Sequence, residues 1–234
     1  MMDISVRSRQ KEQLDDFQGS RKELGVMLED INRVNRLLGG IKITSNAVFR
    51  MIREHKKESY TILDVGCSDG DMLRKLALSA RKSQIPINFI GLDLNNDALE
   101  LAKIKSVDFP EISYLNRDVF TLNSIEVDIV ITTLTLHHFS NTNIPIFLER
   151  FVNMAHIGVI INDLQRSRLA YYLFKAFSVI FIKTETAKND GLISILRGFK
   201  KKELQTFSDQ LTNVQHQISW KWAFRYRWIL KKCV

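Results

Sequence analysis

The chain has 234 residues, of which 45% are hydrophobic and 26% charged, with only 3 Pro and 10 Gly. This composition is typical of a globular protein and excludes a collagenous, disordered or disulfide-built chain. The net charge of +8 does not by itself distinguish a polyanionic partner, an anionic membrane surface and simple solubility.

The two cysteines, Cys67 and Cys233, lie far apart and outside any cluster. We therefore expect neither a disulfide framework nor a metal site. The N-terminus has no apolar secretory signal, and no apolar run reaches the about 18 to 20 residues of a membrane span. Both features favour a cytoplasmic protein.

The first 57 residues are expected to form a helical cap. Apolar residues at three- and four-residue spacing predict an amphipathic helix over residues 24–38, ended by Gly39 and Gly40. A second helix is predicted over residues 45–55, before a charged break. We expect the main domain to span residues 58–234.

From residue 58 short apolar runs alternate with helical periodicity. The runs predict strands over residues 60–65, 87–92, 111–115, 127–132 and 157–161, with helices over 71–81, 96–105 and 143–155. This alternation predicts right-handed crossovers and a parallel sheet, hence the α/β class. A mostly helical lid insertion is expected over about 165–199, followed by a helix over 201–210 and strands over 213–218 and 222–230.

The strongest local signal is the glycine loop that follows the first strand. The loop reads Gly-x-Ser-x-Gly over residues 66–70 and opens a helix, where free backbone N–H groups can bind an acceptor. It has neither the G-x-G-x-x-G spacing of a dinucleotide site nor the Gly-Lys-Ser/Thr of a P-loop.

Acidic residues follow the neighbouring strands at the edge where open α/β sheets bind ligands. Asp93 ends the second strand, where an acid can accept both hydroxyls of a ribose, and Asp118 follows the third strand. Together with the glycine loop, these acids predict a nucleotide-like ligand.

The segment Asp64–Gly70 resembles the first motif of class I S-adenosylmethionine-dependent methyltransferases, with Ser68 in place of the middle glycine. The resemblance implies a Rossmann-like, seven-stranded, mostly parallel sheet. It also implies that Gly66 and the Cys67 backbone face the methionine portion of S-adenosylmethionine, Asp93 the ribose, and Asp118 with Val119 the adenine. The remaining residues expected at the cofactor site are Asp64, Gly70, Leu94 and, in the fourth-strand motif, Thr133.

Methyl transfer from a sulfonium is an in-line displacement that depends mainly on alignment and exclusion of water, although a hydroxyl acceptor must also lose its proton. His137 and His138 follow the fourth strand, and His138 is the stronger candidate base. Bracing of the cofactor loop remains the favoured interpretation of this pair. Asp163 ends the fifth strand as a second catalytic candidate, with helix N-capping as its favoured role.

Later segments resemble a bacterial methyltransferase group found alongside polyketide and other secondary-metabolite enzymes. The shared features are an Asn-Asp-Leu-x-Arg stretch at residues 162–166 leading into Ala-Tyr-Tyr, and Asp190-Gly191 before Ser194 and Arg197. That group commonly has His before the later Asp, where this chain has Asn189. We therefore assign no base at this position.

The aromatic stretch over residues 169–182 predicts a buried lid helix packed on the sheet, because a helix that is apolar nearly all round is usually buried. By extension of this interpretation, we expect the helix to form one wall of a pocket for a hydrophobic acceptor. A peripheral membrane contact helped by Arg166, Arg168 and Lys183 is an alternative.

We favour a methyltransferase acting on a small, hydrophobic or aromatic acceptor, with O-methylation preferred over C-methylation. An RNA methyltransferase is the first alternative, because residues 220–228 interleave aromatic and basic side chains. The same alternation fits an ordinary final strand, and the chain lacks the Asn/Asp-Pro-Pro-Tyr/Phe motif and the nucleophilic cysteine of nucleobase enzymes. A non-catalytic cofactor-binding scaffold is the second alternative.

Overall fold

The computed structural model describes residues 3–122, 125–212 and 214–232. Its elements follow one another along the chain as η1 (Gln13–Asp16), α1 (Arg21–Leu37), α2 (Gly40–Glu54), β1 (Tyr60–Val65), α3 (Asp71–Lys82), β2 (Ile87–Asp93), α4 (Asn96–Lys105), β3 (Ile112–Asn116), β4 (Val127–Thr133), η2 (Leu136–His138), α5 (Asn143–Met154), β5 (Ala155–Leu164), α6 (Arg168–Phe181), α7 (Glu185–Arg197), α8 (Lys201–Ser208), β6 (Val214–Lys221) and β7 (Arg225–Lys232).

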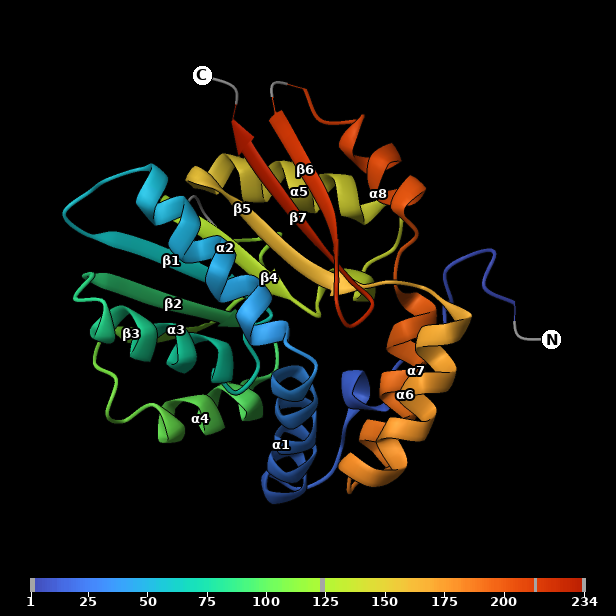
Figure 1. Cartoon of the computed structure of the whole chain (residues 1–234). Helices are drawn as coiled ribbons and strands as arrows, with labels where there is room; N and C mark the ends of the chain where they lie inside the picture. Colours follow the sequence, from blue (N-terminus) through green and yellow to red (C-terminus); the bar gives the residue numbers. More distant parts are fainter. Residues whose placement is uncertain (1–2, 123–124, 213, 233–234) are drawn as a thin grey trace.

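The strands form one seven-stranded sheet in the order β3-β2-β1-β4-β5-β7-β6 (Figure 1). The first five strands in sequence run parallel to one another, and β7 runs antiparallel to both β5 and β6. The predicted seven-stranded, mostly parallel, Rossmann-like sheet is therefore confirmed. The central strands β1 and β4 are buried along nearly their whole length because both faces of the sheet are covered.

Helices cover the two faces of the sheet with separate cores. Alternate residues of β1 point to opposite faces, so Ile62 packs with α2 and α3 and its neighbour Leu63 packs with α5 and α8. The helix α2 shares its core with the sheet through Val48 and Met51. The division of the chain at residue 57 stays a prediction.

The predicted helix break at Gly39 and Gly40 is confirmed. Gly39 has a left-handed φ of +74° and is the N-cap of α2, directly after α1. The other end of α1 is fixed by a capping box, in which the Ser20 side chain accepts from the Glu23 backbone N–H. The capping box and the left-handed glycine thus fix the two ends of α1 through residues in or next to the helix.

The insertion forms two helices, α6 and α7, which lie with α1 and η1 beyond the carboxyl edge of the sheet (Figure 1). The prediction of a buried helix packed on the sheet is wrong for α6, because α6 packs on α7 and buries only Ala170 and Ser178. Arg166 is also not available to a membrane, since it is buried and pairs with Glu203 at 2.5 Å.

The first of the two final strands ends later than predicted, and the second both begins and ends later. β6 runs to Lys221 and β7 begins only at Arg225, because Trp222, Ala223 and Phe224 form the turn between them. Asn213, at the expected start of the first of these strands, lies outside the described residues, as does Cys233. None of the helices in the described part of the chain is long and apolar enough to cross a membrane.

Candidate active site

The glycine loop connects β1 to α3 at the carboxyl edge of the sheet. Gly66 has a left-handed φ of +77°, and a Cβ atom at this position would collide with the Thr135 side chain. Only glycine combines this backbone conformation with so close an approach. Ser68, at the place of the missing middle glycine, also has a positive φ, of 51°. The loop therefore keeps the shape that the sequence predicted despite the substitution.

Asp93, the last residue of β2, is bound directly to this loop. Its Oδ2 accepts from the Ser68 N–H at 2.8 Å and its Oδ1 accepts from the Asn95 N–H at 2.9 Å. Each carboxylate oxygen has a second lone pair for a ligand. Burial raises the pKa of Asp93, although the backbone N–H groups oppose this shift.

Asp64 lies in β1 with only 2% of its surface exposed, and its carboxyl group accepts no hydrogen bond from any residue that the structure describes. Burial, together with the nearby charge of Asp93, raises the pKa of Asp64 to about 8. A buried carboxyl without a donor is costly to ionise, so a cationic ligand beside it would lower that cost.

A cavity of about 900 Å³ extends from the glycine loop to the helices beyond the sheet edge. One end is lined by polar groups that include Asp64, Asp93 and Asp118. The other end has apolar walls, formed by Leu24, Leu28 and Ile31 of α1 and by Leu173, Phe174 and Phe177 of α6. This size and this combination of apolar walls with a few polar groups are typical of small-molecule sites.

Most of the residues predicted for the cofactor site line this cavity. They are Asp64, Gly66, Cys67, Asp93, Leu94, Asp118, Val119 and Thr133. Gly70 does not line it; it takes a left-handed φ of +75° and begins α3. Thr133, the last residue of β4, contacts the hydroxyl of Thr44 in α2 at 3.1 Å.

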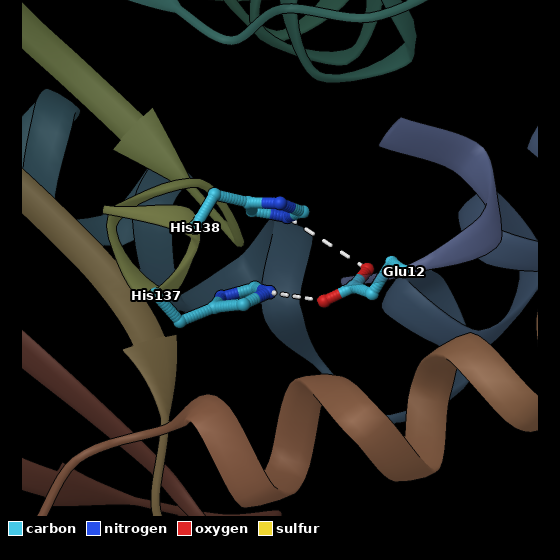
Figure 2. A group of neighbouring side chains, drawn as sticks. All are labelled: Glu12, His137 and His138. Atoms are coloured by element: carbon cyan, nitrogen blue, oxygen red, sulfur yellow. Dashed lines mark ion pairs between the residues drawn. The ribbon is translucent and has the colours of Figure 1, made fainter. Parts of the chain in front are cut away.

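The two histidines lie in η2, directly after β4, and have different surroundings. His137 is buried, with Nδ1 at 2.7 Å from Asp163 Oδ1 and Nε2 at 3.3 Å from Glu12 Oε1. His138 is partly exposed and lines the cavity, with Nδ1 at 2.9 Å from Asp15 Oδ1 and Nε2 at 3.8 Å from Glu12 Oε2. Figure 2 shows both rings directed at the Glu12 carboxylate.

Asp163 does not cap a helix, so the favoured N-cap interpretation is wrong. It lies within β5 and accepts from the His137 and Leu164 N–H groups, while Ser167 is the N-cap of α6. Asp163 does not line the cavity. It contacts His137, which lines the cavity, and we therefore regard it as a positioning residue.

The buried His137 is held between two carboxylates. Burial by itself lowers the pKa of His137, but Asp163 and Glu12 outweigh burial and raise this pKa to about 9. The same pairing lowers the pKa of Asp163 against the effect of burial. His137 is thus an ion-pair partner at neutral pH, which agrees with a bracing role.

Sequence reasoning missed Glu12 and Asp15, which come from the N-terminal segment. This segment is fixed by Asp190 of α7, whose carboxylate accepts from the Gln13 and Leu14 N–H groups at 2.8 and 2.9 Å. Arg197 of α7 also contacts Asp15, at 3.0 Å. The sequence motif that contains Asp190 and Arg197 was recognised, but no sequence periodicity indicated that this motif contacts the N-terminal segment with Glu12 and Asp15.

Comparison with known proteins gives a family match over residues 62–158, described as a methyltransferase domain. A search of curated proteins by sequence finds no significant match. Among solved structures, the plantazolicin methyltransferase BamL, in complex with a triazolic desmethylPZN analogue and SAH, matches with a TM-score of 0.71 and 13% identity over 95% of this chain and 94% of that one.

Two further structures share the fold. Magnesium protoporphyrin IX methyltransferase (ChlM) from Synechocystis PCC 6803, with bound SAM, has a TM-score of 0.59 and 11% identity over 92% of this chain and 99% of that one. A SAM-dependent methyltransferase from Aquifex aeolicus has a TM-score of 0.60 and 14% identity over 91% and 98% of the two chains. The fold of the whole chain, cap and insertion included, is thus shared with such enzymes.

Proposed function

Since residues 62–158 match a methyltransferase domain and the chain shares its fold with S-adenosylmethionine-dependent methyltransferases, we propose that the chain is a class I enzyme of this kind. We propose further that it methylates a small, hydrophobic or aromatic acceptor, with oxygen favoured over carbon as the methylated atom. The observation that carries this proposal is the continuous cavity, which joins the glycine loop and its acids to apolar walls from α1 and α6.

The residues at the polar end fit S-adenosylmethionine. Gly66 lines the cavity with a left-handed backbone that only glycine fits beside Thr135, and the donor-free carboxyl of Asp64 suits the cationic amino group of the methionine portion. We assign the methionine portion to Asp64, Gly66 and Cys67. The other assigned contacts are Asp93 to the ribose, Asp118 and Val119 to the adenine, and Leu94 and Thr133 to the remaining wall.

At the apolar end we place the acceptor. When bound, S-adenosylmethionine supplies a methyl carbon on a positively charged sulfur that leaves as a neutral thioether. The apolar walls exclude water and hold the acceptor oxygen in line with that carbon. His138 lines the cavity with its Nε2 facing Glu12, and this nitrogen is our candidate to take the proton of an acceptor hydroxyl.

A small acceptor is favoured over RNA by the fold of the aromatic and basic tail. Within residues 220–228, Arg225 and Trp228 are buried in β7, with 1% and 0% exposure. These two side chains serve the sheet and are not available to stack on bases or bind phosphates. Trp220 and Trp222 in the same stretch are exposed, and Trp222 lines the cavity. The BamL and ChlM neighbours also act, by their names, on plantazolicin and on a porphyrin.

The cofactor assignment is tested by titration calorimetry with S-adenosylhomocysteine on the wild type, Asp93→Ala and the control Asp108→Ala, whose side chain is exposed. We expect Asp93→Ala to weaken binding more than tenfold and the control to match the wild type. An unchanged affinity for Asp93→Ala would remove the ribose assignment. Wild-type binding weaker than millimolar would remove the proposal that the chain is a methyltransferase.

The acceptor class is tested with radiolabelled S-adenosylmethionine on bulk RNA and, separately, on extracts of phenolic lipids. We expect label in the lipid extract and none in RNA. Label in RNA would reverse the ranking of the two acceptor classes.

A further inference from the structure

We propose that Glu12, His137 and His138 form a binding site for a divalent transition-metal cation of the Zn²⁺ type on the wall of the cavity. The three side chains come from two segments that lie more than 120 residues apart in the chain, η2 and the residue before η1. Figure 2 shows the two histidine rings directed at the two oxygens of the Glu12 carboxylate.

The spacing of the ligand atoms fits such an ion. One ligand atom from each of the three residues can be chosen so that all lie within 4.8 Å of one another. Ligands at 2.0–2.1 Å from a tetrahedral ion lie about 3.3–3.4 Å apart. The His137 Nε2 to Glu12 Oε1 distance is 3.3 Å, and the His138 Nε2 to Glu12 Oε2 distance is 3.8 Å. The two distances run to different oxygens of Glu12, so the bound for the whole set is the 4.8 Å separation, and binding requires the ligand atoms to close by at most about 1.5 Å.

Both imidazoles are oriented as metal ligands usually are. The Nδ1 atom of His137 faces Asp163 at 2.7 Å, and that of His138 faces Asp15 at 2.9 Å. A carboxylate that accepts the Nδ1 proton fixes the tautomer and directs the Nε2 lone pair at the ion. The carboxylates of Asp163 in β5 and Asp15 in η1 thus direct the Nε2 atoms of the two histidines toward the carboxylate of Glu12.

Two of the converging atoms have no hydrogen bond. Glu12 Oε1 and His137 Nε2 are buried and, although they lie 3.3 Å apart, neither makes an aligned hydrogen bond to the other or to any other described residue. Glu12 is 7% exposed and His137 is 2% exposed. Buried polar atoms without partners are rare and costly, so such a pair facing one point indicates a ligand that binds both.

The charges around the site accommodate a dication. Three carboxylates, those of Glu12, Asp15 and Asp163, surround the two imidazoles. The guanidinium of Arg197 lies 3.7 Å from Glu12 Oε1, and Arg7 donates to the His137 carbonyl oxygen. The metal would displace the Nε2 proton of His137 to solvent, and with both imidazoles then neutral the three carboxylates exceed the two guanidiniums by one charge.

Two imidazoles and one carboxylate, with a further position open to the cavity, match the ligand set of catalytic rather than structural zinc sites. An acceptor oxygen at that position would have a lowered pKa and release its proton to water, and His138 would then be a ligand and not the proton acceptor. This last step rests on the proposed function, whereas metal binding does not.

The test is a titration of the chelator-treated full chain with ZnCl₂ by calorimetry, and with CoCl₂ by visible absorption. We expect one equivalent of metal and intense Co²⁺ bands of low coordination number. Glu12→Gln and His138→Asn should each weaken metal binding at least 100-fold, and Asp163→Asn about 10- to 100-fold. The control is His156→Asn with Glu126→Gln, an exposed pair 3.6 Å apart, which should leave the affinity unchanged.

Binding of S-adenosylhomocysteine by each variant reports whether the variant is folded, independently of the metal. Because His138 is partly exposed, His138→Asn should disturb the packing least. Wild-type affinity weaker than millimolar, or equal metal affinity in Glu12→Gln, His138→Asn and the wild type, would overturn the site. Asp93→Ala should lose the cofactor but keep the metal, so failure of one proposal is distinguishable from failure of the other.

Discussion

Asp64 couples the stability of the ligand-free protein to pH. Burial raises its pKa to about 8 from a model-peptide value of 3.8. A carboxyl group whose folded pKa is raised stabilises the fold fully below the unfolded pKa. That stabilisation is lost as the pH rises through the folded pKa, because the unfolded chain has already released the proton.

We therefore expect the free energy of unfolding to fall between about pH 4 and pH 8, by at most about 1.4 kcal/mol per pH unit from this residue. Urea unfolding at pH 5, 6, 7 and 8 measures it. Asp64→Asn should flatten the slope, while Asp108→Asn, an exposed carboxylate, should keep it. Equal slopes in all three proteins would show that Asp64 is not protonated in the fold.

Alanine substitutions at Gly66 and at Gly25 are expected to have opposite effects on the stability of the protein. A Cβ at Gly66 collides with Thr135 in a left-handed backbone, whereas a Cβ at Gly25, within α1, meets its nearest atom, on Leu101, at 3.7 Å. We expect Gly66→Ala to destabilise the protein by about 1–3 kcal/mol and to abolish cofactor binding. Gly25→Ala should stabilise it by about 0.5–1 kcal/mol. Thermal unfolding and calorimetry with S-adenosylhomocysteine check both, and stabilisation by Gly66→Ala would contradict the structure of the loop.

Among the elements, α6 has the most unusual surface. Its outer side exposes large apolar residues, of which Tyr172, Val179 and Ile180 are 58%, 72% and 76% exposed. Its inner side, with Leu173 and Phe174, lines the cavity. The exposed basic residues Arg168, Lys175 and Lys183 flank the outer side. Peripheral contact with an anionic membrane remains our proposal for this surface.

Replacing Val179 and Ile180 together by Ser should leave the free energy of unfolding within about 0.5 kcal/mol of the wild type, because both side chains are exposed. Sedimentation with vesicles of phosphatidylglycerol and phosphatidylcholine should show weaker binding by this variant than by the wild type. Val107→Ser, 80% exposed beyond α4, is the control. A wild type that does not sediment with the vesicles would contradict membrane contact.

For the whole molecule, the cofactor cavity is closed by segments from both halves of the chain. The N-terminal segment bonds to α7 through Asp190, and α1 and α6 line the cavity opposite the sheet. A ligand in this cavity therefore contacts both the sheet and the helices α1 and α6, which lie beyond the carboxyl edge of the sheet. Its binding should stabilise these helices together with the sheet.

S-adenosylhomocysteine at 100 times its Kd should raise the free energy of unfolding by about 2.7 kcal/mol. For a chain of this length the increase corresponds to a rise in Tm of about 5–11 °C. Differential scanning calorimetry measures the shift, and Asp93→Ala at the same ligand concentration should show a smaller one. An equal shift in both proteins would mean that the ligand binds elsewhere.

The sheet and the cofactor edge could be predicted because their signals are local. Strand periodicity, the break at Gly39 and the spacing from Gly66 to Asp93 depend on residues close in sequence, and the parallel crossovers then bring the acids to one edge. The turn at 222–224 was missed because three apolar residues continue the strand pattern on both sides.

The sequence by itself predicted the resemblance to methyltransferases, the seven-stranded sheet and most of the cavity-lining residues at the glycine loop. Only the tertiary structure decided that Asp163 orients His137, that α6 is exposed, and that Glu12 and Asp15 face the two histidines. The physical reason is distance along the chain: Glu12 lies more than 120 residues from His137, and a single contact over that separation leaves no periodic trace in the sequence.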